Sequence, residues 1–196
     1  MPLDLAPLDL DRRTGWPADL RVLLDRYPRE TWPGHPNLGA LCRFWLERHA
    51  MFRELSQALA QGAEALREGR VEAAAFQPWF APRMRFFLQQ LHHHHLVEDH
   101  DYFPLFMAAE QRLVRGFEVL EADHGVIDAA IHELAAASDG LLAALRDPSA
   151  DLARATAGLG SLLPGFLGQL DRHLADEEDL IIPLLLERSE AGLGVG

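Results

Sequence analysis

Cysteine is almost absent from this chain of 196 residues, which contains only Cys42. A single thiol excludes an internal disulfide framework, and it excludes zinc and iron–sulfur sites built from several cysteines. Any metal site in the chain must therefore use histidine and carboxylate ligands.

Long apolar runs are also missing. The densest one, Leu180–Leu186, contains Pro183 and falls well short of the roughly 20 residues that a membrane-spanning helix needs. The N-terminal sequence MPLDLAPLDLDRR is acidic and contains prolines, whereas a signal peptide has a basic start and an unbroken apolar run. We therefore expect a soluble protein located in the cytoplasm.

Basic residues are outnumbered, because 18 Lys and Arg stand against 30 Asp and Glu, for a net charge of −12. Such a surface repels the phosphates of nucleic acids and of anionic membranes. We expect a small molecule as the partner, and neither nucleic acid nor membrane. The composition leaves the oligomeric state open.

β-Branched residues are few, and Leu and Ala dominate a hydrophobic fraction of 48%. This composition favours helices over strands. The sequence therefore predicts an all-α fold.

Prolines set apart an N-terminal arm, residues 1–36, from the rest of the chain. They leave room only for a short helix around residues 19–26. Asn37 is expected to cap the long helix that follows, and this helix is expected to end near Gly69.

Three further amphipathic segments follow the first helix. They are predicted to run from 76–82 to about Pro104, from about Phe117 to a stop between Asp139 and Pro148, and from about Leu159 to Leu184. Pro82 fits a first helical turn. Short connections make neighbouring helices antiparallel, so we predict an up-down-up-down four-helix bundle over 37–187 and a C-terminal tail over 188–196.

A histidine followed four residues later by a glutamate occurs on the second and on the fourth predicted helix, and a further histidine precedes each pair by 45 or 49 residues. The six residues are His49, His94, Glu98, His124, His173 and Glu177. Positions i and i+4 of a helix differ by only about 40° around its axis, so each pair projects from one face. These faces are the apolar stripes, which places all six side chains at core depth.

Buried histidines and carboxylates are costly unless something compensates them. Two cations about 3.5–4 Å apart would do so, with each glutamate bridging both ions and the imidazoles as terminal ligands. If both ions are octahedral and share one hydroxide, about two coordination positions remain for water or substrate.

The segments HHLVEDHDYFP (94–104) and HLADEEDLIIP (173–183) are similar to the two His-Glu helix segments of the hemerythrin-like, or HHE cation-binding, family. The resemblance covers roughly residues 37–187. It implies a non-haem di-iron centre, oxo- or hydroxo-bridged, held by the six residues named above. Zinc or manganese is the alternative metal.

The third predicted helix departs from the oxygen-carrying hemerythrins, which have two histidines four residues apart there. Here the pair is His124 and Asp128. Asp128 is therefore a further candidate metal ligand, and His132, about 80° around the helix from His124, is a weaker one. The departure argues against reversible oxygen carriage in particular.

Several neighbours of the candidate ligands are given supporting or surface positions. His92, His93 and His95 point in directions other than that of His94 and are expected to face solvent or to lie behind the ligands. Asp99 and Glu178 directly follow the two glutamates and are expected to be exposed or to hydrogen bond to ligand histidines.

Open positions on a redox metal in an apolar pocket suit a small diatomic ligand or peroxide. The sequence thus predicts a di-iron protein that binds, senses or reacts with oxygen, peroxide or nitric oxide, and it leaves open whether the protein is an enzyme. Two alternatives remain: a protein that stores oxygen or reports iron and oxygen levels without turnover, and a structural zinc or manganese site. A ferritin-type oxidase is disfavoured, because that fold uses Glu-x-x-His.

Overall fold

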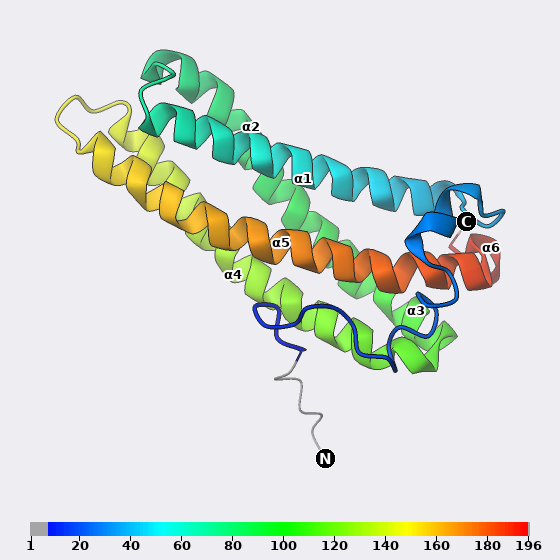
Figure 1. Cartoon of the computed structure of the whole chain (residues 1–196). Helices are drawn as coiled ribbons and strands as arrows, with labels where there is room; N and C mark the ends of the chain where they lie inside the picture. Colours follow the sequence, from blue (N-terminus) through cyan, green and yellow to red (C-terminus); the bar gives the residue numbers. More distant parts are fainter. Residues whose placement is uncertain (1–7, 196) are drawn as a thin grey trace. The chain divides into compact units, whose positions relative to one another are not determined.

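The computed structural model describes residues 8–195, and each regular element in that range is helical. Four long helices carry most of the chain, namely α1 (Ala40–Arg67), α2 (Ala73–Val97), α4 (Val114–Ala144) and α5 (Leu152–Arg188) (Figure 1). The shorter elements are the 3₁₀ helices η2 (Arg29–Gly34) and η4 (Gln111–Leu113), the π-helix η3 (Glu98–Tyr102), α3 (Phe103–Ala109) and α6 (Glu190–Leu193). The predicted all-α fold is confirmed over the described residues.

The ends of α1 are set by two local features. The helix begins at Ala40, so the prediction that Asn37 caps it is wrong; the side-chain amide of Asn37 instead donates to the carbonyl oxygen of Leu186 at 2.7 Å. At the other end Gly69 has a positive φ of 69°, and the Arg70 N–H donates to the carbonyl oxygen of Ala65 at 2.8 Å. This left-handed glycine ends α1 close to where the sequence predicted.

Prolines shape the helices less than expected. Pro82 lies in the interior of α2 and not in its first turn, because α2 begins at Ala73. Pro183 lies inside α5, which continues past it to Arg188. In the arm, residues 19–26 form hydrogen-bonded turns where a short helix was expected.

The chain divides into two compact units, and each long helix contributes a segment to both. Unit 1 comprises Met1–Ala50, His95–Gly125 and Asp171–Gly196, and unit 2 comprises Met51–His94 and Val126–Leu170. None of the described helices combines the length and the apolar character needed to cross a membrane.

Unit 2 has an almost purely apolar interior. The ring of Phe87 on α2 lies 6.3 Å from that of Phe52 on α1 and 5.9 Å from that of Phe166 on α5, measured between centroids. Its buried polar side chains, within the described residues, are the hydroxyls of Ser56, Ser138 and Thr156. The aromatic contacts join three helices. No charged side chain is buried among the described residues of this unit.

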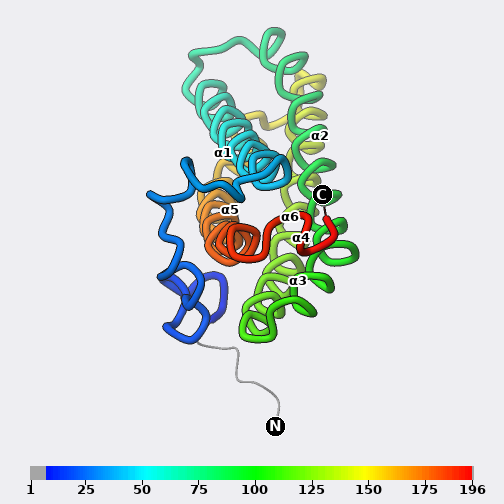
Figure 2. Tube along the Cα trace, turned by 90° about the vertical axis from the view of Figure 1, so that its right-hand side faces the viewer, coloured from blue at the N-terminus to red at the C-terminus, as the bar shows by residue number. Residues whose placement is uncertain are grey.

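Unit 1 incorporates the N-terminal arm into its core. Trp16 and Trp32 of the arm belong to the same buried cluster as Trp45 on α1 and Phe117 on α4. Figure 2 shows the arm running beside the C-terminal part of α5. Among the described residues, all buried charged side chains and all buried histidines lie in this unit. The chemistry of the molecule is therefore concentrated in unit 1.

Candidate metal centre

Five of the six predicted ligands are buried in unit 1, on four different elements. They are His49 on α1, Glu98 on η3, His124 on α4, and His173 and Glu177 on α5, each at most 4% exposed. On α5 the buried side chains include a series at steps of three or four residues, namely Leu163, Phe166, Leu170, His173 and Glu177. The amphipathic pattern that forms this helix therefore also directs its two candidate ligands inward.

Candidate ligand atoms gather in two groups within unit 1. The first contains His49, Glu98 and Glu177, and the second contains His95, His124 and His173, with the ligand atoms of each group within 4.8 Å of one another. The groups adjoin, because His124 Nε2 lies 3.5 Å from Glu98 Oε2 and His173 Nε2 lies 3.4 Å from Glu177 Oε2. Two neighbouring cations that share carboxylates fit this arrangement.

His95 does not face solvent, which was one of the two positions expected for it. It is 4% exposed, and its ring stacks on that of His124 with 4.1 Å between centroids and meets the ring of His173 at 5.2 Å. The signal was present in the sequence, because His95 stands three residues before Glu98, and positions i and i+3 are also neighbours on a helix. The expectation that it faces solvent or lies behind the ligands considered only the direction of His94.

A π-helical turn begins at Glu98. The Phe103 N–H donates to the Glu98 carbonyl oxygen, five residues back, and Pro104 then lies in the first turn of α3. This wider turn brings Asp99 inward as well as Glu98, and Asp99 Oδ1 lies 2.7 Å from His124 Nδ1. Single π turns occur mainly at functional sites. The second helix was predicted to run to about Pro104, whereas α2 ends at Val97 and the π turn follows it.

A carboxylate lies behind each of three buried histidines. Glu178 Oε1 is 3.0 Å from His49 Nδ1, and Asp99 and Asp123 approach the Nδ1 atoms of His124 and His173 at 2.7 and 3.4 Å. Asp99 and Glu178 were expected to be exposed or to hydrogen bond to histidines, and the structure has the second arrangement. Asp123 was not singled out from the sequence. These carboxylates fix each ring so that Nε2 points toward the centre.

The Nε2 atoms of His124 and His173 are fully buried and have no hydrogen-bond partner among the described residues, while the opposite nitrogen of each ring faces a carboxylate. The nearest carboxylate oxygens, at 3.5 and 3.4 Å, lie beyond ordinary hydrogen-bond length. Two ligand atoms bound at right angles to one cation about 2.1 Å away lie about 3 Å apart. The donor set therefore fits a metal better than it fits a hydrogen-bond network.

The electrostatics of the protein alone are unfavourable. Burial, together with the charge of Glu177, raises the pKa of Glu98 well above its usual range. Burial lowers the pKa of His124. Burial opposes protonation of His173 too, but Asp123 and Glu177 outweigh it and raise the pKa of His173 to about 9. Cations at the centre would stabilise the ionised glutamates and the neutral imidazoles together.

His94 ends the first segment of unit 2, and the chain passes directly from it to His95 in unit 1. It is partly buried, and its ring centroid lies 5.1 Å from that of Phe52. Its place along the chain, four residues before Glu98, is the argument for counting it among the ligands.

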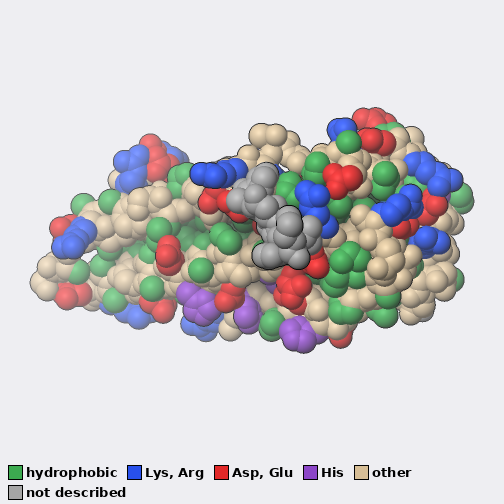
Figure 3. Space-filling model, turned by 90° about the horizontal axis from the view of Figure 1, so that it is seen from below, with side chains coloured by type: hydrophobic (Ala, Val, Ile, Leu, Met, Phe, Trp, Pro, Cys, Tyr) green, Lys and Arg blue, Asp and Glu red, His purple; other side chains and the backbone are tan. Residues whose placement is uncertain are grey.

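Asp128 is a partly exposed residue of unit 2. Its carboxylate is 41% exposed and lies 2.8 Å from His92 Nδ1 and 3.6 Å from His132 Nδ1. Both histidines are exposed, and Figure 3 shows histidine side chains at the surface of one face of the molecule. Asp128 and His132 belong to neither ligand group found among residues 8–195. We therefore leave both out of the proposed ligand set.

The helices and the two ligand groups together define an all-helical, cation-binding protein. The model of the Hemerythrin HHE cation binding domain matches residues 41–185, and the chain belongs to that family. No curated protein and no solved structure matches the chain. The family assignment covers all of the candidate ligands and leaves the N-terminal arm outside it.

Proposed function

We propose that the protein holds two iron ions in a carboxylate-bridged centre and uses them to bind, sense or react with oxygen, peroxide or nitric oxide. The observation that carries the proposal is the pair of buried Nε2 atoms of His124 and His173, each facing a glutamate oxygen without a hydrogen bond. We further propose that the four long helices form the antiparallel up-down-up-down bundle expected for this family.

The ligands divide between the two ions. Glu98 and Glu177 would hold both ions, since each lies near an imidazole from another helix: His124 Nε2 is 3.5 Å from Glu98, and His49 Nε2 is 3.6 Å from Glu177. His49 and His94 would hold one ion, and the neighbouring imidazoles of His95, His124 and His173 would hold the other. This assignment replaces the predicted Asp128 with a fifth histidine.

The donor count leaves room for one small ligand. Five imidazoles, two bridging carboxylates and one bridging oxygen leave about one position on a pair of octahedral ions. That position would belong to the ion held by His49 and His94, which has the fewer imidazoles. The argument against reversible oxygen binding was that Asp128 stands where oxygen carriers have a further histidine. It no longer applies if His95 supplies that further histidine ligand.

Bound iron supplies a redox couple and a site at which a small ligand becomes polarised. The protein holds the ligands in place and keeps bulk water out. Phe103 packs on the His124 ring with 5.4 Å between centroids, and Phe117 lies 5.2 Å from Phe103. Apolar walls of this kind admit small neutral molecules more readily than ions.

Metal analysis combined with optical spectra of the anaerobically reduced protein, before and after oxygen, tests the proposal in one sample. We expect about two iron ions per chain and a near-ultraviolet band that requires oxygen. If the band disappears on removing oxygen, the protein binds oxygen reversibly; if it persists, the protein reacts. Zinc or manganese in the isolated protein, with no response to oxygen or hydrogen peroxide after iron loading, would overturn the redox function in favour of a structural site.

A further inference from the structure

The N-terminal arm reaches the metal centre through two arginines. We propose that Arg13 and Arg29 are positioning residues of the centre, each acting on one ligand histidine through a buried carboxylate. Arg13 acts through Asp123 on His173, and Arg29 acts through Glu178 on His49. The inference depends on the proposed function only in that these two histidines bind metal.

Arg13 is buried, at 3% exposure, between α4 and α5. Its guanidinium donates to both carboxylate oxygens of Asp123 on α4 and, at 2.6 Å, to Asp176 on α5. Buried arginine in such a fork fixes a carboxylate in orientation as well as in charge. Asp123 Oδ2, which accepts from Arg13, is also the oxygen that faces His173 Nδ1. The arm therefore determines where the partner of His173 lies.

Further contacts hold Arg13 in this position. Its backbone carbonyl oxygen accepts from Arg172, the residue before His173. The indole of Trp16 lies against the guanidinium, with 5.0 Å to the ring centroid, and its Nε1 donates to the carbonyl oxygen of Asp176 at 2.8 Å. These contacts tie the arm to the turn of α5 that carries both candidate ligands.

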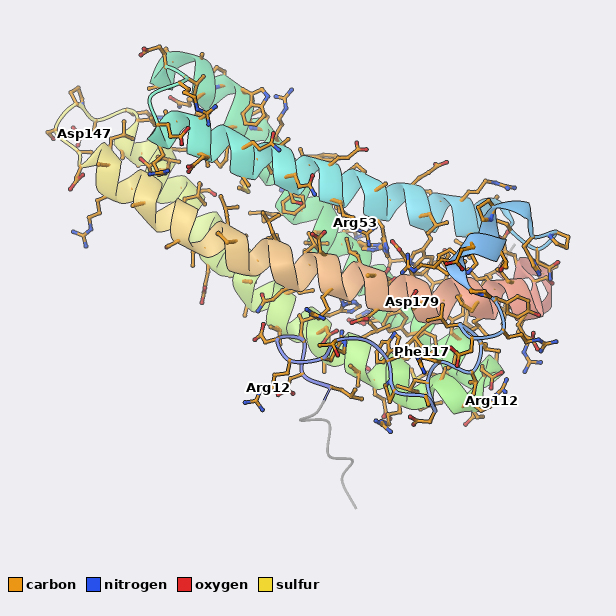
Figure 4. The ribbon with its side chains drawn as sticks, viewed as in Figure 1. Arg12, Arg53, Arg112, Phe117, Asp147 and Asp179 are labelled. Carbon is orange, nitrogen blue, oxygen red and sulfur yellow. The ribbon has the colours of Figure 1, made fainter. Side chains whose placement is uncertain are left out.

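Arg29 makes the corresponding contact for His49. Its guanidinium donates to Glu178 at 2.8 Å, to Asp179 at 2.7 Å and to the carbonyl oxygen of Ala175 at 2.8 Å. Figure 4 labels Asp179 on α5. Glu178 uses Oε2 for Arg29 and presents Oε1 to His49 Nδ1 at 3.0 Å. One carboxylate thus joins an arm arginine to a ligand imidazole.

The two series of contacts, Arg13–Asp123–His173 and Arg29–Glu178–His49, lead to ligands of different ions. A metal-bound imidazole donates its second N–H to such a carboxylate, which fixes the ring and increases its basicity. Without its arginine the carboxylate is a buried, uncompensated charge that is free to turn toward solvent. We therefore expect each arginine to affect the affinity of one ion more than that of the other.

Arg29→Gln is the leading test, because the Arg29 side chain is 42% exposed and its loss should not prevent folding. Arg26→Gln is the matched control; Arg26 is also on the arm and pairs with Glu187 on α5 at 2.7 Å, but touches no carboxylate behind a ligand. Full-length proteins loaded with Fe²⁺ or Zn²⁺ are compared by chelator competition. We expect Arg29→Gln to lower the affinity for one of the two ions about tenfold, which is the lower end of the effect of mutating hydrogen-bond partners of metal ligands. Arg29→Lys should recover part of this affinity.

A spectroscopic readout separates positioning from general stability. In the Zn²⁺-loaded protein the imidazole N–H protons of His49 and His173 should give slowly exchanging NMR signals. Arg29→Gln should lose the His49 signal and Arg13→Lys the His173 signal, while Arg26→Gln keeps both. Unchanged affinities and signals in Arg29→Gln, or equal changes in Arg26→Gln, would overturn the inference. A wild-type protein that binds no pair of ions would instead overturn the proposed function.

Discussion

Trp45 Nε1 donates a hydrogen bond to Glu177 Oε1 at 2.5 Å, across from α1 to α5. Trp45 stands one turn before His49, and its ring also meets that of Tyr102, with 5.0 Å between centroids. The same indole therefore contacts a candidate bridging ligand and the π-helical turn. Trp45 is also part of the buried apolar cluster of unit 1, so it is both a core residue and a neighbour of the site.

Trp45→Phe should weaken metal binding through Glu177 without disrupting the packing of the core. Phenylalanine retains an aromatic ring but cannot donate to Glu177, so the carboxylate loses a bond to a charged acceptor. We expect metal affinity to fall about tenfold, measured by chelator competition, with the helical circular dichroism unchanged. Trp79→Phe, in unit 2, is the control and should bind metal normally; an affinity loss of the same size there would remove the special role of Trp45.

His95→Ala separates the ligand set of the structure from that predicted by the sequence. If His95 binds one ion together with His124 and His173, its loss should reduce the metal content from about two ions per chain to about one. His93→Ala is the matched control, because His93 is an exposed neighbour on the same helix. Two retained ions in His95→Ala would return this residue to a supporting position.

Asp128→Ala and His132→Ala should leave the metal centre unchanged. Both side chains are at least partly exposed, and their contacts with each other and with His92 are surface interactions worth about 1 kcal/mol or less. We expect two ions per chain by metal analysis and an unaltered optical spectrum of the iron-loaded protein. A shifted spectrum or a changed azide affinity in Asp128→Ala would restore the sequence-based ligand.

Helical periodicity predicted the elements and most of the burial. The stripes through His49, His124 and His173 gave the long helices and their inward faces, because an apolar face must pack against another apolar face. The same periodicity gave five buried candidates out of six. The burial of His95 on α2 was missed, because only the direction of His94 was followed there.

Periodicity failed where the helix is not regular or where contacts come from distant residues. The π turn at Glu98–Tyr102 changes the angular step, so the directions of Asp99 and its neighbours could not be obtained from α-helical geometry. Arg13 and Asp123 are 110 residues apart, and no local pattern relates them. The choice of Asp128 as a further candidate came from its position four residues after His124, whereas the structure places His95, and not Asp128, in a group of candidate ligands.

Glu110 should make stability dependent on acid. Arg112, and with it Arg188, donates to this carboxylate at 2.8 and 3.2 Å and lowers the pKa of Glu110 to about 2. A lowered folded-state pKa adds stability that is fully present above the unfolded value of about 4.3 and is lost as the pH falls toward 2. Because both arginines are about half exposed, we discount the contribution to about 1 kcal/mol.

Glu110→Gln should therefore lower the free energy of unfolding by about 1 kcal/mol at pH 7 and by less at pH 3. Urea unfolding at the two pH values measures the difference, with Glu133→Gln as an exposed control. A difference that stays constant between pH 7 and pH 3 would contradict the ion-pair explanation.

Removal of metal should loosen unit 1 and spare unit 2. Glu98 and Glu177 are buried in unit 1, and without cations each leaves a charge that must be protonated or hydrated. The buried polar side chains of unit 2 are neutral hydroxyls, and its one proposed ligand, His94, is only partly buried and is the last residue of its segment. Hydrogen exchange of the chelated protein should therefore speed up around Asp123 and His173 while amides around Phe87 stay protected. Uniform loss of protection in both units would show that the metal stabilises the fold as a whole, and unchanged protection everywhere would contradict the argument that the buried glutamates need cations.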